Sequence, residues 1–186
     1  TALWSRMLDH PKSLASAYAR LWRAQVGRQR EFYDQVRERF NKTHNSACFL
    51  YLLARCVKAA IRYNSAGEFN NSPDNRRLGA RPQTMKARIT GATALLGGRT
   101  LITNRDYRDV LSECGPADLI YMDPPYQGVC GGRDHRYAPK VKFTDFCEAL
   151  RELNRKGCRY IVSYDGRSGS KIYGQTLPSD LGLKHL

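Results

Sequence analysis

The second half of the chain alternates helical patterns with short strand-like runs, and this alternation most limits the folds open to it. Helical patterns occupy 82–96 (PQTMKARITGATALL), 107–114 (YRDVLSEC) and 143–157 (FTDFCEALRELNRKG). Runs typical of strands occupy 100–104 (TLITN), 118–122 (DLIYM) and 158–164 (CRYIVSY), and 181–186 (LGLKHL) begins one more. Strands that alternate with helices predict a parallel sheet, so we expect an α/β fold.

One predicted strand ends in an acid followed by two prolines and an aromatic residue, Asp123, Pro124, Pro125 and Tyr126. Ligands of an open parallel sheet bind beyond the carboxyl ends of its strands, which is where Asp123 would lie. Proline fixes φ and lacks an N–H donor, so the carbonyls here are held in a stiff arrangement. A carboxylate, a rigid carbonyl and the Tyr126 ring together predict a cradle for an amino group on a planar ring. The alternative is a simple turn at the end of a strand.

The first third of the chain has helical periodicity. Residues 11–41 predict two helices separated by Gly27, with Pro11 in the first turn. Their apolar residues repeat on one face, and we expect them to form core: Leu14, Tyr18, Leu21, Trp22, Phe32, Val36 and Phe40. A third helix is expected to begin at Asn45 or Ser46. The run 46–64 predicts that this helix is buried in its first half and cationic in its second.

Residues 62–82 (RYNSAGEFNNSPDNRRLGARP) break the periodicity and predict turns. Arginines, asparagines and the aromatic residues Tyr63 and Phe69 are interleaved there. Arginine can bind guanine or phosphate, asparagine can bind adenine, and an aromatic ring can stack on a base. A solvated basic loop would have the same composition, so both interpretations stay open at this point.

The net charge of the chain also favours a nucleic-acid partner. Lys and Arg number 31 against 17 Asp and Glu, a formal net charge of +14 among 186 residues. Such an excess indicates a polyanionic partner, most often nucleic acid, although a soluble basic protein of another kind has it too. No apolar run approaches the roughly 20 residues of a membrane span, so no membrane partner is expected.

The cysteines predict neither a metal site nor disulfides. They lie at 48, 56, 114, 130, 147 and 158, with no Cys-x-x-Cys pair and no zinc spacing. They are typical of free thiols in a reducing cytoplasm. Cys130, Asp134 and His135 follow the two prolines, but their spacing fits no ordinary metal site.

The segment DPPY after an apolar strand resembles the catalytic motif of the amino-group DNA methyltransferases. Its surroundings resemble the Dam-like (D12 class) adenine-N6 methyltransferases, in which the pattern RYN..G.FN recurs before DPPY. The segments that carry this resemblance are SACFLYLLARCVKAAIRYNSAGEFN, NSPDNRR, RPQTM, NRDYRDVL and YIVSYDG. They cover roughly residues 46 to 175 in family order.

The resemblance implies a site-specific enzyme that transfers a methyl group from S-adenosylmethionine to adenine N6 in duplex DNA after flipping the base. Asp123 and the Pro124 carbonyl, with Pro125, would bind the amine, and Tyr126 would stack on the base. Asp106, Tyr107 and Asp123 would line the cofactor site, although Asp106 can also cap the helix that follows it. DNA contacts are implied for Arg62, Tyr63, Asn64, Asn70, Arg76, Arg77 and Arg81, with a core position as the alternative for Tyr63.

The resemblance also implies an overall plan. We expect a partial Rossmann-like methyltransferase sheet with a helical and loop DNA-recognition region. Residues 1–45 would be a helical connector, 46–82 the recognition helix and loop, and 83–186 the catalytic core. The implied setting is a bacterial or phage restriction–modification system, in the cytoplasm.

The chain departs from the family pattern at both ends. Nothing in 1–61 resembles the family's glycine-rich turn or the acid that ends its second strand, and 181–186 resembles a strand without its hairpin partner. We therefore expect half of the cofactor pocket to come from a longer polypeptide or a second chain, or to be lost through truncation of the gene. The alternatives are a non-catalytic DNA-binding fragment or subunit, and an enzyme that acts on cytosine N4 or on an RNA base.

Overall fold

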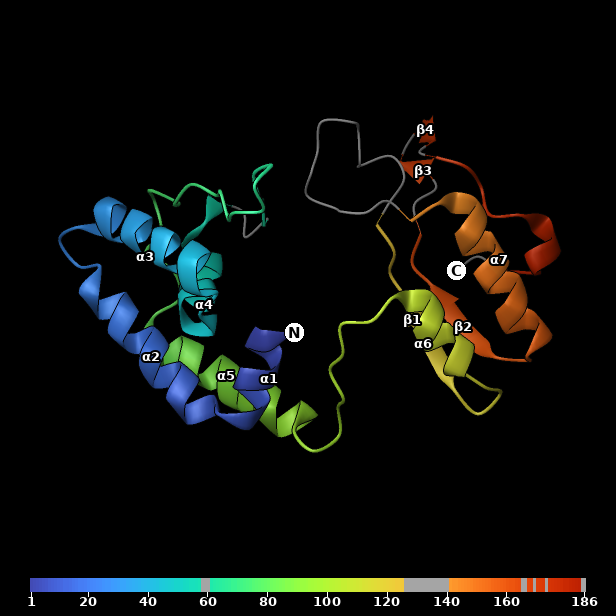
Figure 1. Cartoon of the computed structure of the whole chain (residues 1–186), viewed down its shortest axis with the longest axis horizontal. Coiled ribbons are helices and arrows are strands. Elements are labelled where there is room, and N and C mark those ends of the chain that lie inside the picture. The colour runs from blue at the N-terminus through green and yellow to red at the C-terminus, as the bar shows by residue number, and fades with distance from the viewer. Residues whose placement is uncertain (58–60, 126–140, 165–166, 169, 173, 185–186) are drawn as a thin grey trace. The chain divides into compact units, whose positions relative to one another are not determined.

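The computed structural model describes residues 1–57, 61–125, 141–164, 167–168, 170–172 and 174–184 (Figure 1). They form two units, Thr1–Asn104 and Arg105–Leu186. Tyr126 and the trio Cys130, Asp134 and His135 lie outside the described residues. No helix in the described part of the chain is both long and apolar enough to cross a membrane.

The first unit contains five helices within its described residues: α1 (Ala2–Asp9), α2 (Pro11–Ala24), α3 (Gln29–Thr43), α4 (Ser46–Arg55) and α5 (Pro82–Leu96). Pro11 begins α2, and Gly27, with φ of 84°, separates α2 from α3. Asn45 caps α4, since its side chain accepts hydrogen bonds from the backbone N–H groups of Ala47 and Cys48. These three predicted boundaries are confirmed.

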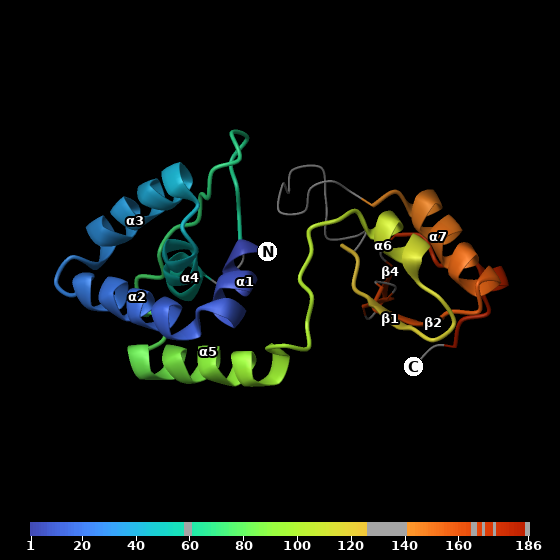
Figure 2. The same cartoon turned by 60° about the horizontal axis from the view of Figure 1, so that its bottom comes forward.

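The core of the first unit lies among α2, α3, α4 and α5. Helix α2 packs against α4 and α5, and α3 packs against α4; Figure 2 shows α5 running alongside α2. The predicted core residues Leu14, Tyr18, Phe32, Val36 and Phe40 are buried. Leu21 and Trp22 are partly buried against the same cluster. The helical faces read from the sequence are therefore confirmed.

Helix α4 ends at Arg55, so the prediction of a helix through 46–64 is wrong for the described residues. Tertiary pairing ends it. Cys56 forms an antiparallel bridge with Pro73, and the Asp74 N–H donates to the Arg55 carbonyl at 2.7 Å. The Arg55 side chain, expected on a cationic surface, is only 2% exposed.

The second unit is built on a parallel strand pair. Strands β1 (Leu119–Met122) and β2 (Arg159–Val162) pair from Leu119↔Arg159 to Met122↔Val162. Helices α6 (Tyr107–Glu113) and α7 (Phe143–Arg155) flank them in sequence, and β3 (Arg167–Ser168), β4 (Lys171–Ile172) and the 3-10 helix η2 (Ser179–Leu181) follow. This mixture of helices and a small parallel sheet agrees with the α/β expectation, whereas the Rossmann-like sheet stays a prediction.

The sheet of β1 and β2 has one packed face. Ile120, Met122, Tyr160 and Val162 pack on the cluster of α6 and α7 residues that includes Leu111, Phe146, Leu150 and Leu153. On the other face Leu119, Tyr121 and Ile161 are 67%, 66% and 49% exposed. Within the described residues these strands are therefore apolar on both faces but buried on only one.

Two predicted strands are absent from the residues that the structure describes. Residues 100–104 have no strand structure, and Leu101 is 88% exposed. At 181–184, Leu181 ends η2 and Gly182 has φ of 63° instead of an extended conformation. A strand exists through hydrogen bonds to a neighbour, and within the described residues β1 pairs only with β2. An apolar run without such a neighbour therefore remains irregular.

Candidate functional site

A pocket of about 270 Å³ lies where β1 ends. Its lining comes from α6, β1 and α7 and from the segments next to them: Tyr107, Leu111, Tyr121, Met122, Asp123, Pro124, Pro125, Val141 and Phe146. The fold thus brings the predicted residue Tyr107 together with Asp123, Pro124 and Pro125. Tyr126 was predicted beside them and lies outside the described residues.

Asp123 is the single carboxylate in this described lining. Its side chain is exposed, and no hydrogen bond or ion pair to it occurs among the described residues. Within the described residues, both carboxylate oxygens can therefore accept hydrogen bonds from a bound group. The rest of the lining is mostly apolar or aromatic. Such a pocket suits a flat ring that carries an amino group.

Aromatic rings form one wall of the pocket. The Tyr107 and Phe146 rings meet edge to face, with centroids 6.4 Å apart, and Tyr164 stacks on Phe146 at 5.5 Å. Burial raises the pKa of the Tyr107 hydroxyl above its ordinary value, so the hydroxyl is neutral at physiological pH. The Arg108 guanidinium lies 5.9 Å from the centre of the Tyr107 ring.

Asp106 caps α6 and is not part of the pocket lining. Its carboxylate accepts a hydrogen bond from the Arg108 backbone N–H at 2.9 Å and from the Arg108 guanidinium at 3.0 and 3.1 Å. The Arg108 hydrogen bonds hold the pKa of this carboxyl below its usual value. The capping role considered from the sequence is therefore present, and a cofactor contact by Asp106 remains a prediction.

In the first unit, residues 62–71 form a short hairpin. Tyr63 pairs with Phe69 in an antiparallel bridge, and the Asn70 N–H donates to the Arg62 carbonyl at 2.9 Å. Tyr63 also packs edge-on against Phe69, at 6.2 Å between centroids, while 41% of it stays exposed. Tyr63 thus meets the core and still presents a surface to solvent.

Asn64 builds the turn of hairpin 62–71. Its side-chain oxygen accepts from the Ala66 and Glu68 N–H groups at 3.0 and 2.9 Å, and its amide nitrogen donates to the Glu68 carboxylate at 2.9 Å. Gly67 completes the turn with φ of 76°. Any DNA contact by the Asn64 side chain, which stays a prediction, would have to share these groups.

The other residues predicted to contact DNA are exposed: Arg62, Asn70, Arg76, Arg77 and Arg81. No carboxylate lies within ion-pair distance of these four arginines among the described residues. Their guanidinium groups are therefore available to an anion. Arg76 and Arg77 lie in the loop 74–81, which leads into α5, and Arg81 is the N-terminal cap residue of that helix.

Comparison with known families gives this arrangement a chemical context. The model of the D12 class N6 adenine-specific DNA methyltransferases matches residues 2–185. The chain belongs to this family.

Two relatives carry names that agree with this family. A DNA N-6-adenine-methyltransferase of Escherichia phage P1 is 28% identical over 149 residues, which is 73% of this chain and 19% of the relative. A Type II methyltransferase of Methanocaldococcus jannaschii is 25% identical over 170 residues, which is 85% of this chain and 57% of the relative. This D12-class chain thus spans less than two thirds of either relative.

The basic excess of the D12-class chain belongs to its first unit. Residues 1–104 contain 18 Lys and Arg against six Asp and Glu, a net charge of +12. Residues 105–186 contain 13 against 11, a net charge of +2. The unit that bears hairpin 62–71 is therefore the one with the charge expected of a nucleic-acid surface.

Sequence reasoning missed two groups of residues. Five pocket residues were not singled out: Leu111, Tyr121, Met122, Val141 and Phe146. Tyr121 and Met122 could have been found as the last residues of the strand before Asp123. The second group lies on α3 and hydrogen-bonds to the backbone of hairpin 62–71, as described below. In the sequence, this second group is marked by a polar group at every fourth residue of α3. The sequence of that helix was interpreted only for its apolar face.

Proposed function

We propose that the chain supplies the amine-binding site and the DNA-contacting hairpin of an enzyme that methylates adenine N6 in duplex DNA. The observation that carries the proposal is the pocket at the end of β1, which gathers Asp123, Pro124 and Tyr107 in a member of the D12 class. The basic first unit with its exposed arginines supports DNA as the substrate.

The methyl donor proposed is S-adenosylmethionine, which supplies an electrophilic methyl group on a sulfonium. The pocket fits part of this molecule. Tyr107, Phe146 and Leu111 would hold its planar adenine against an apolar wall. The neutral Tyr107 hydroxyl can hydrogen-bond to a ring nitrogen or to the ribose.

Asp123 and the Pro124 carbonyl would hold the target amine. The N6 lone pair of adenine is delocalised into the ring, which makes the free base a weak nucleophile. Two acceptors that bind the two N–H groups favour a tetrahedral nitrogen with its lone pair directed out of the ring plane. The prolines fix the carbonyls, so this geometry exists before the base arrives. As the N–C bond forms and the S–C bond breaks, the nitrogen must release a proton, and Asp123 is the carboxylate of the lining that can accept it.

The adenine must leave the duplex for this chemistry, because its amino group is otherwise paired. Arg62, Arg76 and Arg77 are exposed and would hold the DNA backbone or read bases while the adenine is flipped. Tyr126, outside the described residues, would stack on the flipped base.

Cytosine N4 or an RNA amine would suit the same carboxylate and carbonyl. The family model and the phage relative are both named for adenine N6 in DNA, which favours adenine. A non-catalytic fragment would bind DNA without transferring a methyl group.

The test compares Asp123→Asn with Asp109→Asn, an exposed carboxylate of α6 that is not in the pocket lining. With methyl-labelled S-adenosylmethionine and duplex DNA, Asp123→Asn should lower the transfer rate by about 100-fold or more. Asp109→Asn should match the parent chain, and both variants should keep the parent's thermal unfolding. Transfer by Asp123→Asn at the parent rate would remove Asp123 from the mechanism. No transfer by the parent chain would favour the non-catalytic alternative.

A further inference from the structure

We propose that Tyr33, Arg37 and Asn41 on α3 are positioning residues that fix hairpin 62–71 and so set the DNA-sequence preference of the chain. This inference rests on the proposed function, in which the hairpin contacts DNA. The role assigned to this face of α3 is to bind the backbone of the hairpin, and the role does not require the face to contact DNA.

The three residues are spaced four apart, so they lie on one face of the helix. All three hydrogen-bond to the backbone of the returning half of the hairpin. The Tyr33 hydroxyl and Arg37 Nη1 donate to the Asn71 carbonyl at 3.0 and 3.3 Å. Asn41 Nδ2 donates to the Phe69 carbonyl at 3.3 Å. The face therefore holds the hairpin at two successive points, one turn or more apart on α3.

The Asn41 side chain hydrogen-bonds to both the N–H and the carbonyl of Phe69. Its side-chain oxygen also accepts from the Phe69 N–H at 2.9 Å. The bonds that join the two halves of the hairpin use the residues on either side, Glu68 and Asn70, so the peptide groups of Phe69 point outward. The Asn41 amide thus pairs with Phe69 as a neighbouring strand would.

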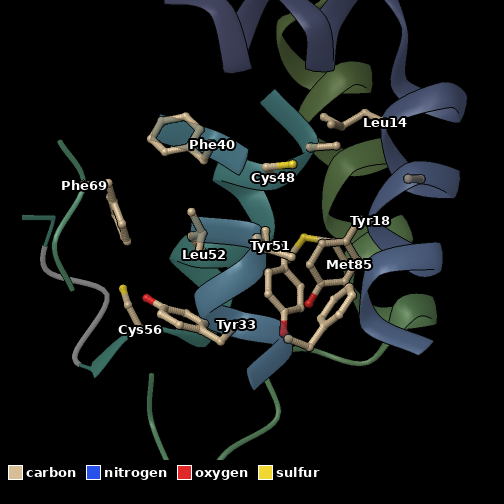
Figure 3. Close-up of a cluster of buried hydrophobic side chains, with 14 of the residues drawn as sticks. Leu14, Tyr18, Tyr33, Phe40, Cys48, Tyr51, Leu52, Cys56, Phe69 and Met85 are labelled. Carbon is tan, nitrogen blue, oxygen red and sulfur yellow. The ribbon is translucent and has the colours of Figure 1, made fainter. Parts of the chain in front are cut away.

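Buried aromatic rings fix the depth of the hairpin but not its register along α3. Phe69 is 1% exposed and meets Phe40 and Phe49 at 5.9 and 6.2 Å between centroids. Figure 3 shows Phe69 at the edge of the buried cluster that includes Phe40 and Leu52. A hairpin displaced along α3 would leave the Phe69 and Asn71 backbone groups unpaired in a partly buried place, which is unfavourable.

The hydrogen bonds between α3 and Asn71 also constrain the exposed residue Arg62. Asn71 is 5% exposed, and its side-chain oxygen accepts from the Arg62 N–H at 2.7 Å. Tyr33 and Arg37 bind the carbonyl of the same Asn71. The backbone position of Arg62 is therefore tied through Asn71 to α3. Loss of these contacts would change where the Arg62 guanidinium is presented to DNA.

The experiment selects duplexes from a pool with a randomised central segment and sequences those that bind. Four variants are compared with the parent chain. Asn41→Ala removes the pairing with Phe69, and Tyr33→Phe removes a single hydroxyl as a milder second variant. Thr43→Ala is the control on the same helix, since among the described residues the Thr43 hydroxyl bonds only to the Arg39 carbonyl of α3. Arg62→Ala tests whether the hairpin contacts DNA.

We expect Asn41→Ala to lower the enrichment of the preferred sequence by roughly tenfold, with total affinity for the pool changed by less than about threefold. Tyr33→Phe should shift enrichment in the same direction by less, and Thr43→Ala should match the parent. Hydrogen exchange of the Phe69 amide should speed up by roughly tenfold in Asn41→Ala. That exchange reports the contact directly, without DNA.

Two results would overturn the inference in different ways. If Arg62→Ala weakens selection while Asn41→Ala and Tyr33→Phe select the parent sequence with parent enrichment, α3 does not set the preference and the proposed function stands. If Arg62→Ala and the parent bind the pool alike, or the parent shows no preference, the hairpin does not read DNA, and its assigned role in the proposed function falls as well.

Discussion

Gly67 and Gly79 have nearly the same backbone conformation, with φ of 76° and 78°, but different surroundings. A Cβ at Gly79 would lie 3.0 Å from the Ala54 carbonyl oxygen and 3.2 Å from Cδ of Arg55. A Cβ at Gly67 would have no described atom within 4 Å apart from those of its own residue and its two chain neighbours. The pair therefore separates the strain of a left-handed backbone from that of a close contact.

We predict that Gly67→Ala lowers the free energy of unfolding of the first unit by about 1 kcal/mol, the strain of a left-handed alanine. Gly79→Ala should lower it by roughly 2 to 4 kcal/mol, because the new Cβ also presses on backbone that cannot rotate away. Urea unfolding followed by helical circular dichroism measures both. Equal losses for the two variants would mean that loop 74–81 does not approach α4 as closely as the structure shows.

At the scale of elements, the parts that the sequence predicted well are those with a local cause. The segments of α5, α6, α7, β1 and β2 were all predicted, because each has its own periodicity, apolar run or cap. The left-handed Gly157, with φ of 70°, ends the helical segment of α7 as predicted.

The elements that were predicted wrongly depend on contacts with residues far away in the sequence. Helix α4 stops at Arg55 because the backbone there pairs with a distant segment: Cys56 forms an antiparallel bridge with Pro73, and the Asp74 N–H donates to the Arg55 carbonyl at 2.7 Å. Those residues lie about twenty positions further along the chain. Residues 100–104 are not a strand, because no described neighbour pairs with them. For the same reason the pocket could be predicted at Asp123, at the end of its strand, but not at Phe146, which arrives from α7.

The cap of α4 gives an element-scale prediction. Asn45 binds two N–H groups of the first turn, and α4 carries the core residues Tyr51 and Leu52. Asn45→Ala should therefore lower the free energy of unfolding by about 1 kcal/mol, whereas Asn45→Ser, which keeps a capping oxygen, should lower it by only a few tenths. Thermal or urea unfolding compares the two. Identical values for Ala and Ser would show that the cap contributes nothing to α4.

At the scale of the whole molecule, buried tyrosines should limit stability at high pH. Burial raises the pKa of Tyr18 to about 12, and it also raises the pKa of Tyr33 and Tyr51 above the ordinary value near 10. A folded-state pKa above the unfolded one stabilises the fold fully below about pH 10, and this contribution is lost as the pH rises toward 12.

We therefore predict that helical circular dichroism of the chain is lost between about pH 10 and 12, together with the appearance of tyrosinate absorbance from the buried rings. The variant Tyr18→Phe, which removes one such hydroxyl, should show a shallower dependence of unfolding free energy on pH in this window. Ionisation of every tyrosine near pH 10 without loss of helix would contradict the burial of these side chains.

The two units have different roles in the proposed function. The second carries the pocket with Asp123, and the first carries hairpin 62–71, loop 74–81 and most of the net positive charge. DNA binding should therefore weaken steeply as salt increases, and the dependence should become shallower when Arg76 and Arg77 are replaced by alanine.

The most direct measurement is the identity of the methylated nucleoside. The chain is incubated with duplex DNA and methyl-labelled S-adenosylmethionine, and the DNA is then digested to nucleosides and separated. We expect the label in N6-methyldeoxyadenosine, and a strong reduction of that label with Asp123→Asn. Label in N4-methyldeoxycytidine would contradict the account, and DNA that the chain binds but leaves unlabelled would favour the non-catalytic alternative.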